Sequence, residues 1–209
     1  MPIIVLYASL VSFLAAPPPF PAAPKPALKG SWVLNAAQSD DARALLEARQ
    51  RAMTRARPGM DRPGMGGGGD GMGGGMGGAA PAGGTSVYRE RARNVVQSVI
   101  DAPAAFTITQ DDTSLVLAYG KGRRTVLITD GEKLTDNVDG IGYVDTMAEW
   151  ERHHLVVDHR FEVGGRLVED FSLSPDASQL LVAVEFDSPR TGKVRFRRVY
   201  DRSAAPPGD

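Results

Sequence analysis

The stretch HLVVDHRFEVGGRLVEDFSL, residues 154–173, shows the pattern that governs the C-terminal half of the chain. Apolar residues recur at even spacing through 154–161 and again through 166–173, and Gly164-Gly165 separates the two runs. They are Leu155, Val157 and Phe161 in the first run and Leu167, Phe171 and Leu173 in the second. Alternation with a period of two is typical of a strand with one buried face, and paired glycines supply the positive φ angles of a tight hairpin. The stretch therefore predicts two antiparallel strands joined by a short turn.

The same pattern extends in both directions from this hairpin. Asp-Gly pairs, Gly-Gly pairs and prolines separate short alternating runs, as expected for hairpin turns. Together with Gly30 to Leu34, the predicted strands are 106–110, 114–119, 124–129, 133–138, 143–151, 154–161, 166–173, 179–186 and 193–200. About ten such strands suffice to close on themselves. We therefore predict a mostly β, up-and-down antiparallel barrel.

Two helices are predicted between the first and second strands. Ser39 is placed to cap the first helix, which is expected to end at Arg55. Ser86 is placed to cap the second, in which apolar residues recur at helical spacing from Ala92 to Ile100. The helical spacing indicates a narrow apolar stripe that faces a core.

The N-terminal segment has the composition of an export signal. Residues 3–16 form an uncharged apolar run, shorter than the roughly 20 residues of a membrane-spanning helix but suited to the core of a signal peptide. We predict a signal peptide over 1–23, a proline-rich leader over 24–28 and an exported protein, periplasmic or extracellular. A buried N-terminal strand or helix is the alternative interpretation of the same run.

The chain is otherwise expected to form one domain with an insertion. Residues 29–202 make up the predicted barrel domain, and within it 58–84 consist largely of glycine and methionine. Glycine loses the most backbone entropy on ordering and brings no side chain to a core, so this insert is predicted to be disordered. Residues 203–209 are predicted to be a disordered tail.

Composition excludes several classes of function. The 24 Lys and Arg residues nearly balance the 25 Asp and Glu residues, so no net field attracts nucleic acid. Without cysteine the chain has no disulfide framework, thiolate metal site or cysteine nucleophile. No G-x-S-x-G, H-E-x-x-H or Walker motif in a suitable context occurs. We predict a protein that is not an enzyme, takes no cofactor, and has no membrane span once the signal is removed.

Strand alternation places a few polar side chains inside the predicted barrel. These candidate ligand-binding residues are Tyr119, Trp150, His159, Glu169 and Arg198. Buried polar groups are costly unless they are paired with one another or with a ligand. One hypothesis is a cavity for a small hydrophobic or amphipathic molecule, with an acidic head held by Arg198 and an apolar tail against the wall.

Gly30-Ser31-Trp32 resembles the G-x-W that opens the first strand of the calycin superfamily, which includes the lipocalins and fatty-acid-binding proteins. The resemblance implies a calycin-like barrel in which a basic residue of the last strand packs across the tryptophan, and Arg198 matches that residue. The chain is also similar to secreted bacterial proteins with a Gly/Met-rich insert and a final strand that ends like Arg198-Val199-Tyr200-Asp201.

Two other interpretations remain open. In the first, side chains fill the barrel, Arg198 stacks on Trp32 and is neutralised by Glu169, and the protein is a structural or interaction protein of the cell envelope tethered by the Gly/Met insert. The second is a Cu(I) site, because thioethers are soft ligands that select Cu(I). Its methionines would be Met60, Met65, Met72 and Met76.

Overall fold

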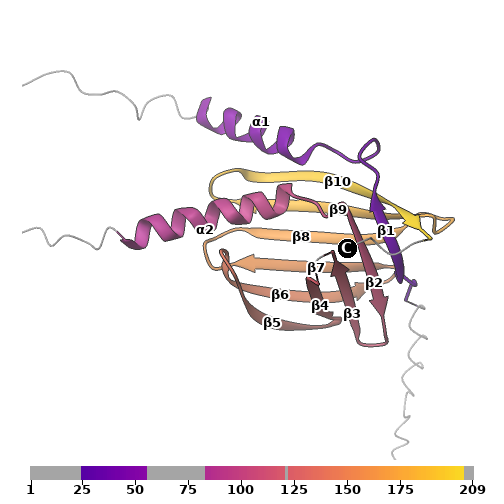
Figure 1. Ribbon diagram of the computed structural model, residues 1–209. Coiled ribbons are helices and arrows are strands. Elements are labelled where there is room, and N and C mark those ends of the chain that lie inside the picture. The colour runs from indigo at the N-terminus through magenta and orange to yellow at the C-terminus, as the bar shows by residue number, and fades with distance from the viewer. Residues whose placement is uncertain (1–24, 56–82, 121, 205–209) are drawn as a thin grey trace, which may run out of the picture.

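The computed structural model describes residues 25–55, 83–120 and 122–204 (Figure 1). The predicted signal peptide lies outside these residues. So do 58–82 of the predicted insert, with the four methionines of the Cu(I) alternative, and 205–209 of the predicted tail.

The described residues form one antiparallel sheet of ten strands and two helices, which confirms the predicted fold class. In chain order the elements are β1 (Gly30–Leu34), α1 (Ala42–Arg55), α2 (Gly83–Ile100), β2 (Ala105–Gln110), β3 (Ser114–Tyr119), β4 (Arg124–Ile128), β5 (Asp130–Val138), β6 (Gly142–Glu151), β7 (His154–Phe161), β8 (Arg166–Leu173), β9 (Gln179–Ser188) and β10 (Gly192–Ser203). Both helices lie between β1 and β2, as predicted. α2 begins before the expected Ser86, and β10 includes Ser203.

The sheet curls into a nearly closed barrel. Its strand order is β4-β3-β2-β1-β10-β9-β8-β7-β6-β5, so β1 joins the first part of the chain to the last strand. The sheet ends at β4 and β5, and no strand pairing joins these two within the described ranges. The general expectation that Asp-Gly pairs form hairpin turns is therefore wrong at Asp130-Gly131, because β5 starts at Asp130 itself and, among the described strands, pairs with β6 alone. We call the opening between these two strands the β4–β5 seam.

Alternate residues of each strand fill the barrel interior, as the sequence pattern predicts. On β7, Leu155 and Val157 are almost fully buried, and on β9 the same is true of Val182, Val184 and Phe186. Burying one such side chain contributes about 1.5–3 kcal/mol relative to leaving it exposed. The inward faces of the strands therefore supply the driving force for closing the wall.

α1 packs along β10, on the outside of the barrel (Figure 1). The N-cap of α1 is Asp41, whose carboxylate accepts a hydrogen bond from the Ala44 amide at 2.9 Å. The prediction that Ser39 caps the helix is wrong, because α1 starts at Ala42 and Ser39 lies too far upstream. The Ser39 hydroxyl instead accepts a hydrogen bond from the Val199 amide at 2.9 Å and so fastens the approach to α1 onto β10.

α2 crosses one mouth of the barrel. Asn94 donates a hydrogen bond to the Gly140 carbonyl, in the β5–β6 turn, at 2.8 Å, and Arg91 pairs with Glu162, in the β7–β8 turn, at 3.2 Å. Val95 on the same helix is buried. The helix therefore covers the ends of these hairpins. Neither helix of the described ranges is long and apolar enough to cross a membrane.

Trp32 lies on β1, opposite the C-terminal end of strand β10, and is completely buried. Its indole N–H donates to the Leu28 carbonyl at 3.0 Å. Arg202 lies over the ring, with its guanidinium carbon 4.4 Å from the ring centroid. The predicted pairing with Arg198 is wrong. Strand register places Arg202 directly opposite Trp32, whereas Arg198 lies four residues away along β10, or about 13 Å.

The position of Arg202 over Trp32 also depends on glycine at position 30. Its φ angle is +147°, a conformation that residues with a side chain rarely adopt. A Cβ atom at this position would lie 2.6 Å from the Nη1 atom of Arg202. Glycine thus leaves room for the guanidinium that covers Trp32.

The β8–β9 turn contains an acidic residue with an unusually low pKa. The Asp176 carboxylate accepts hydrogen bonds from the Ser174 hydroxyl at 2.6 Å and from the Ser178 hydroxyl at 2.8 Å, and these bonds lower the Asp176 pKa to about 2. We expect NMR titration to give this value, and Ser178→Ala to raise it towards 3.8. Because the folded pKa is depressed, the stabilisation is complete above the unfolded pKa and is lost as the pH falls through about 2. A midpoint near 3.8 in the unmodified protein would contradict the hydrogen-bonded turn.

Candidate functional site

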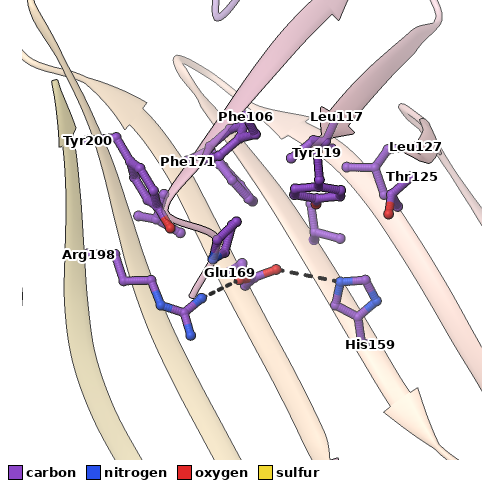
Figure 2. Close-up of a pocket in the computed structure, with 13 residues that line it drawn as sticks. Phe106, Leu117, Tyr119, Thr125, Leu127, His159, Glu169, Phe171, Arg198 and Tyr200 are labelled. Atoms are coloured by element: carbon purple, nitrogen blue, oxygen red, sulfur yellow. Dashed lines mark hydrogen bonds and ion pairs between the residues drawn. The ribbon is translucent and has the colours of Figure 1, made fainter. Parts of the chain in front are cut away.

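The barrel encloses a cavity of about 140 Å³, which we call the chamber (Figure 2). Its walls come from β2, β3, β4, β7, β8, β9 and β10, and from Pro103 just after α2. The apolar lining residues are Pro103, Phe106, Leu117, Leu127, Val157, Phe171 and Val182. The polar ones are Tyr119, Thr125, His159, Glu169, Arg198 and Tyr200. An apolar wall with a few convergent polar groups is typical of a small-molecule site.

A buried ion pair lies at the polar side of the chamber. The Nη1 atom of Arg198 is 3.3 Å from the Oε1 atom of Glu169, and the two side chains are only 8% and 18% exposed. The Nη2 atom of Arg198 donates a hydrogen bond to the carbonyl of Val99, in the last turn of α2. A cation near a helix C-terminus interacts favourably with the helix dipole. Arg198 therefore links the chamber to the helix over the mouth.

His159 approaches the other oxygen of the same carboxylate. Its Nε2 atom is 3.7 Å from the Oε2 atom of Glu169, and its Nδ1 atom is 2.9 Å from the Thr146 hydroxyl. Burial by itself raises the pKa of the Glu169 carboxyl, but His159 and the Arg198 guanidinium outweigh it and lower the pKa below its ordinary value. Glu169 is therefore ionised at neutral pH, and Arg198 compensates its charge.

Two tyrosines add neutral hydroxyl groups to the chamber. The rings of Tyr119 and Tyr200 flank Phe106, with centroid distances of 6.0 and 4.9 Å. Burial is the main cause that raises the pKa of both phenols, so both stay protonated at neutral pH. Among the described residues, no hydrogen-bond partner is seen for the Tyr200 hydroxyl, which faces the chamber. It is available to donate to a bound oxygen atom.

Strand register explains why the charged groups meet. Glu169 pairs with Val157 on β7 and with Val184 on β9, and Val184 in turn pairs with Phe196 on β10. Arg198 is the next inward residue after Phe196. Glu169 and Arg198 thus occupy diagonal inward positions, which lie within reach of long side chains.

A larger cleft at the β4–β5 seam adjoins the chamber. This cleft has a volume of about 660 Å³ and shares Thr125, Leu127 and His159 with the chamber. Leu134 and Val138 on β5 point towards it yet remain 50% and 38% exposed. The open seam therefore leaves an accessible apolar surface beside the polar groups of the chamber.

Four of the five predicted interior residues line the chamber together: Tyr119, His159, Glu169 and Arg198. Trp150 does not line it. It is half-buried on β6, at the level of Leu155, where it packs against the core. Alternation assigned Trp150 to the correct face, but the chamber lies between other strands.

Sequence reasoning missed Tyr200, Thr125 and Phe106 as lining residues. Tyr200 had a usable signal, because it lies two positions after Arg198 and so shares its inward face. For Thr125 and Phe106 the signal was weaker, since both lie near strand ends whose level in the barrel depends on register.

Comparison with known proteins gives only distant likenesses. No protein-family model matches the sequence, and no curated protein matches it. Among solved structures, the fatty acid transporter REP1-NXSQ has 12% identity and a TM-score of 0.45, over 85% of this chain and 97% of the transporter.

Two other solved structures have a similar sequence identity and TM-score. Lipid binding protein 8 of Caenorhabditis elegans has 12% identity and a TM-score of 0.45, over 84% of this chain and 94% of that protein. The zebrafish ileal bile acid-binding protein with cholic acid has 10% identity and a TM-score of 0.44, over 84% and 98%. The strand order and register of this chain itself define its fold.

Proposed function

We propose that this protein binds a small amphipathic molecule, with the polar head in the chamber and the apolar body in the cleft at the β4–β5 seam. One observation carries the proposal: the polar groups of Glu169, Arg198 and Tyr200 converge in an apolar-walled chamber that shares Thr125, Leu127 and His159 with that cleft. The role is binding rather than catalysis. Export through the predicted signal peptide is part of the same proposal.

The volumes support a ligand that extends from one space into the other. The chamber, at about 140 Å³, is smaller than the roughly 300–1,000 Å³ of ordinary small-molecule pockets. The adjoining cleft, at about 660 Å³, lies within that range. A head group of a few atoms fits the chamber, and a chain of methylene groups would cover the exposed faces of Leu134 and Val138 in the cleft.

A neutral fluorescent naphthalene, N-phenylnaphthylamine, tests this proposal. We expect saturable binding to the full chain. Leu134→Trp should weaken it by about tenfold, because an indole at an inward position of β5 occupies the cleft. Fluorescence titration gives both dissociation constants.

Met147→Trp is the matched control. Met147 lies on β6 opposite Lys133, faces outward and is 37% exposed, so the same enlargement outside the barrel should leave binding unchanged. If the unmodified chain shows no saturable binding, the filled barrel of an interaction protein becomes the better explanation. Equal weakening by both substitutions would place the bound naphthalene outside the cleft.

A further inference from the structure

We infer that the proposed site prefers an uncharged, hydrogen-bonding head, such as an alcohol or a primary amide, over a carboxylate. This inference rests on the proposed function and names the class of head group. It runs against the hypothesis from the sequence, in which Arg198 holds an acidic head. The reason lies in what already surrounds Arg198.

The Arg198 guanidinium is already engaged by the protein. One of its terminal nitrogens lies beside Glu169, and the other donates to the Val99 carbonyl. Its side chain is only 8% exposed. A carboxylate binds an arginine best through two parallel hydrogen bonds. Such a ligand would have to displace a protein partner from Arg198.

Charge balance gives the second reason. The ion pair of Glu169 and Arg198 is neutral as a whole, and Glu169 keeps its charge because its pKa is lowered. An anionic head in the chamber would add a second carboxylate beside Glu169, and like charges that share a buried site strongly disfavour one another. A cationic head would meet Arg198 in the same way. Only a neutral head leaves the balance intact.

The chamber offers partners for a neutral head. The Glu169 carboxylate is only an acceptor, so it suits an O–H or N–H donor. The Tyr200 hydroxyl stays protonated and suits an acceptor oxygen. An alcohol or primary amide has both functions, whereas an ionised carboxylate has no donor to offer Glu169.

Four ligands with the same chain length test the inference. Decanol, decanamide, decanoate and decylamine are each titrated against bound N-phenylnaphthylamine at about pH 8, where carboxylates are ionised. We expect decanol and decanamide to displace the naphthalene at concentrations at least about tenfold lower than the two charged ligands. Equal potency of decanoate and decanol would overturn the inference.

Glu169→Gln separates this effect from the greater hydrophobicity of decanol. The variant leaves the charge of Arg198 uncompensated, so the preference for decanol over decanoate should fall by about tenfold or more relative to the unmodified chain. Glu185→Gln is the matched control, since Glu185 lies on the outside of β9 and pairs with Lys193 and Arg195. An unchanged preference in Glu169→Gln would overturn the inference.

The outcomes distinguish this inference from the proposed function. If the naphthalene does not bind, the proposed function fails and the inference fails with it. If it binds and decanoate displaces it as well as decanol does, the function stands and the inference fails. Circular dichroism checks the fold of each variant. If Glu169→Gln does not fold, equal potency of decanoate and decanol on the unmodified chain still overturns the inference, and weaker displacement by decanoate than by decanamide supports it.

Discussion

Replacing Trp32 by alanine is expected to lower the free energy of unfolding by about 3–5 kcal/mol. The indole is completely buried between β2 and β10, and its removal leaves a cavity that the paired strands around it cannot readily fill. The substitution also frees the Leu28 carbonyl and the Arg202 guanidinium from the ring. Urea denaturation followed by circular dichroism measures the change.

Val33→Ala is the control for this prediction. Val33 is the next residue of β1, points outward and is 42% exposed, so its truncation should cost about 1 kcal/mol or less. Arg202→Met removes only the guanidinium that lies over the Trp32 ring. It should lower the free energy of unfolding by about 0.5–1 kcal/mol, as for other cation–π pairs near the surface. A Trp32→Ala variant that loses no more than Val33→Ala would show that β1 does not hold the barrel closed.

The sequence pattern predicted individual strands accurately where turn chemistry was strong. β7 and β8 span 154–161 and 166–173 as predicted, because alternation marks each strand and Gly164-Gly165 marks the turn. The same signal failed at Asp130-Gly131, where β4 and β5 diverge instead of pairing. A turn signature predicts a change of direction, but pairing also needs contacts between the strands that follow.

The level of a residue along the barrel was harder to predict than its face. The predicted last strand ends at residue 200 and so leaves out Arg202. Although Arg198 and Arg202 share one face of β10, alternation alone cannot say which of them lies opposite Trp32. That choice depends on the register between the first and last strands, which are distant in sequence. The same limit applies to Trp150, which has the predicted face but does not line the chamber.

The sequence predicted those parts of the candidate site that depend only on which face of a strand a residue occupies. Glu169, His159 and Arg198 were expected inside because of their apolar neighbours two positions away, and they do converge. The link from Arg198 to the Val99 carbonyl was not predictable, because it depends on where α2 lies across the mouth. Arg198 thus also ties α2 to the barrel wall, which adds a second contribution to the stability that its replacement is expected to cost.

Arg198→Met is expected to lower the free energy of unfolding by about 3–5 kcal/mol at pH 8, because it removes the guanidinium that pairs with the buried Glu169 carboxylate at 3.3 Å. His159, with its Nε2 atom 3.7 Å from the carboxylate, stays beside Glu169 in this variant. The loss should shrink at acidic pH, where the carboxylate of the variant takes up a proton. Urea denaturation curves at pH 8 and at an acidic pH measure the loss of stability and its decrease on protonation.

The double variant Arg198→Met/Glu169→Leu tests whether the unpaired charge causes that loss. Replacing a whole buried ion pair with apolar side chains of similar size is often neutral or stabilising, so the double variant should be more stable than Arg198→Met alone. Both variants lack the hydrogen bond to the Val99 carbonyl, so any deficit that remains measures what Arg198 contributes through α2. If the double variant is no more stable than the single one, the contribution of Arg198 lies in holding α2 over the mouth, and compensation of Glu169 adds little.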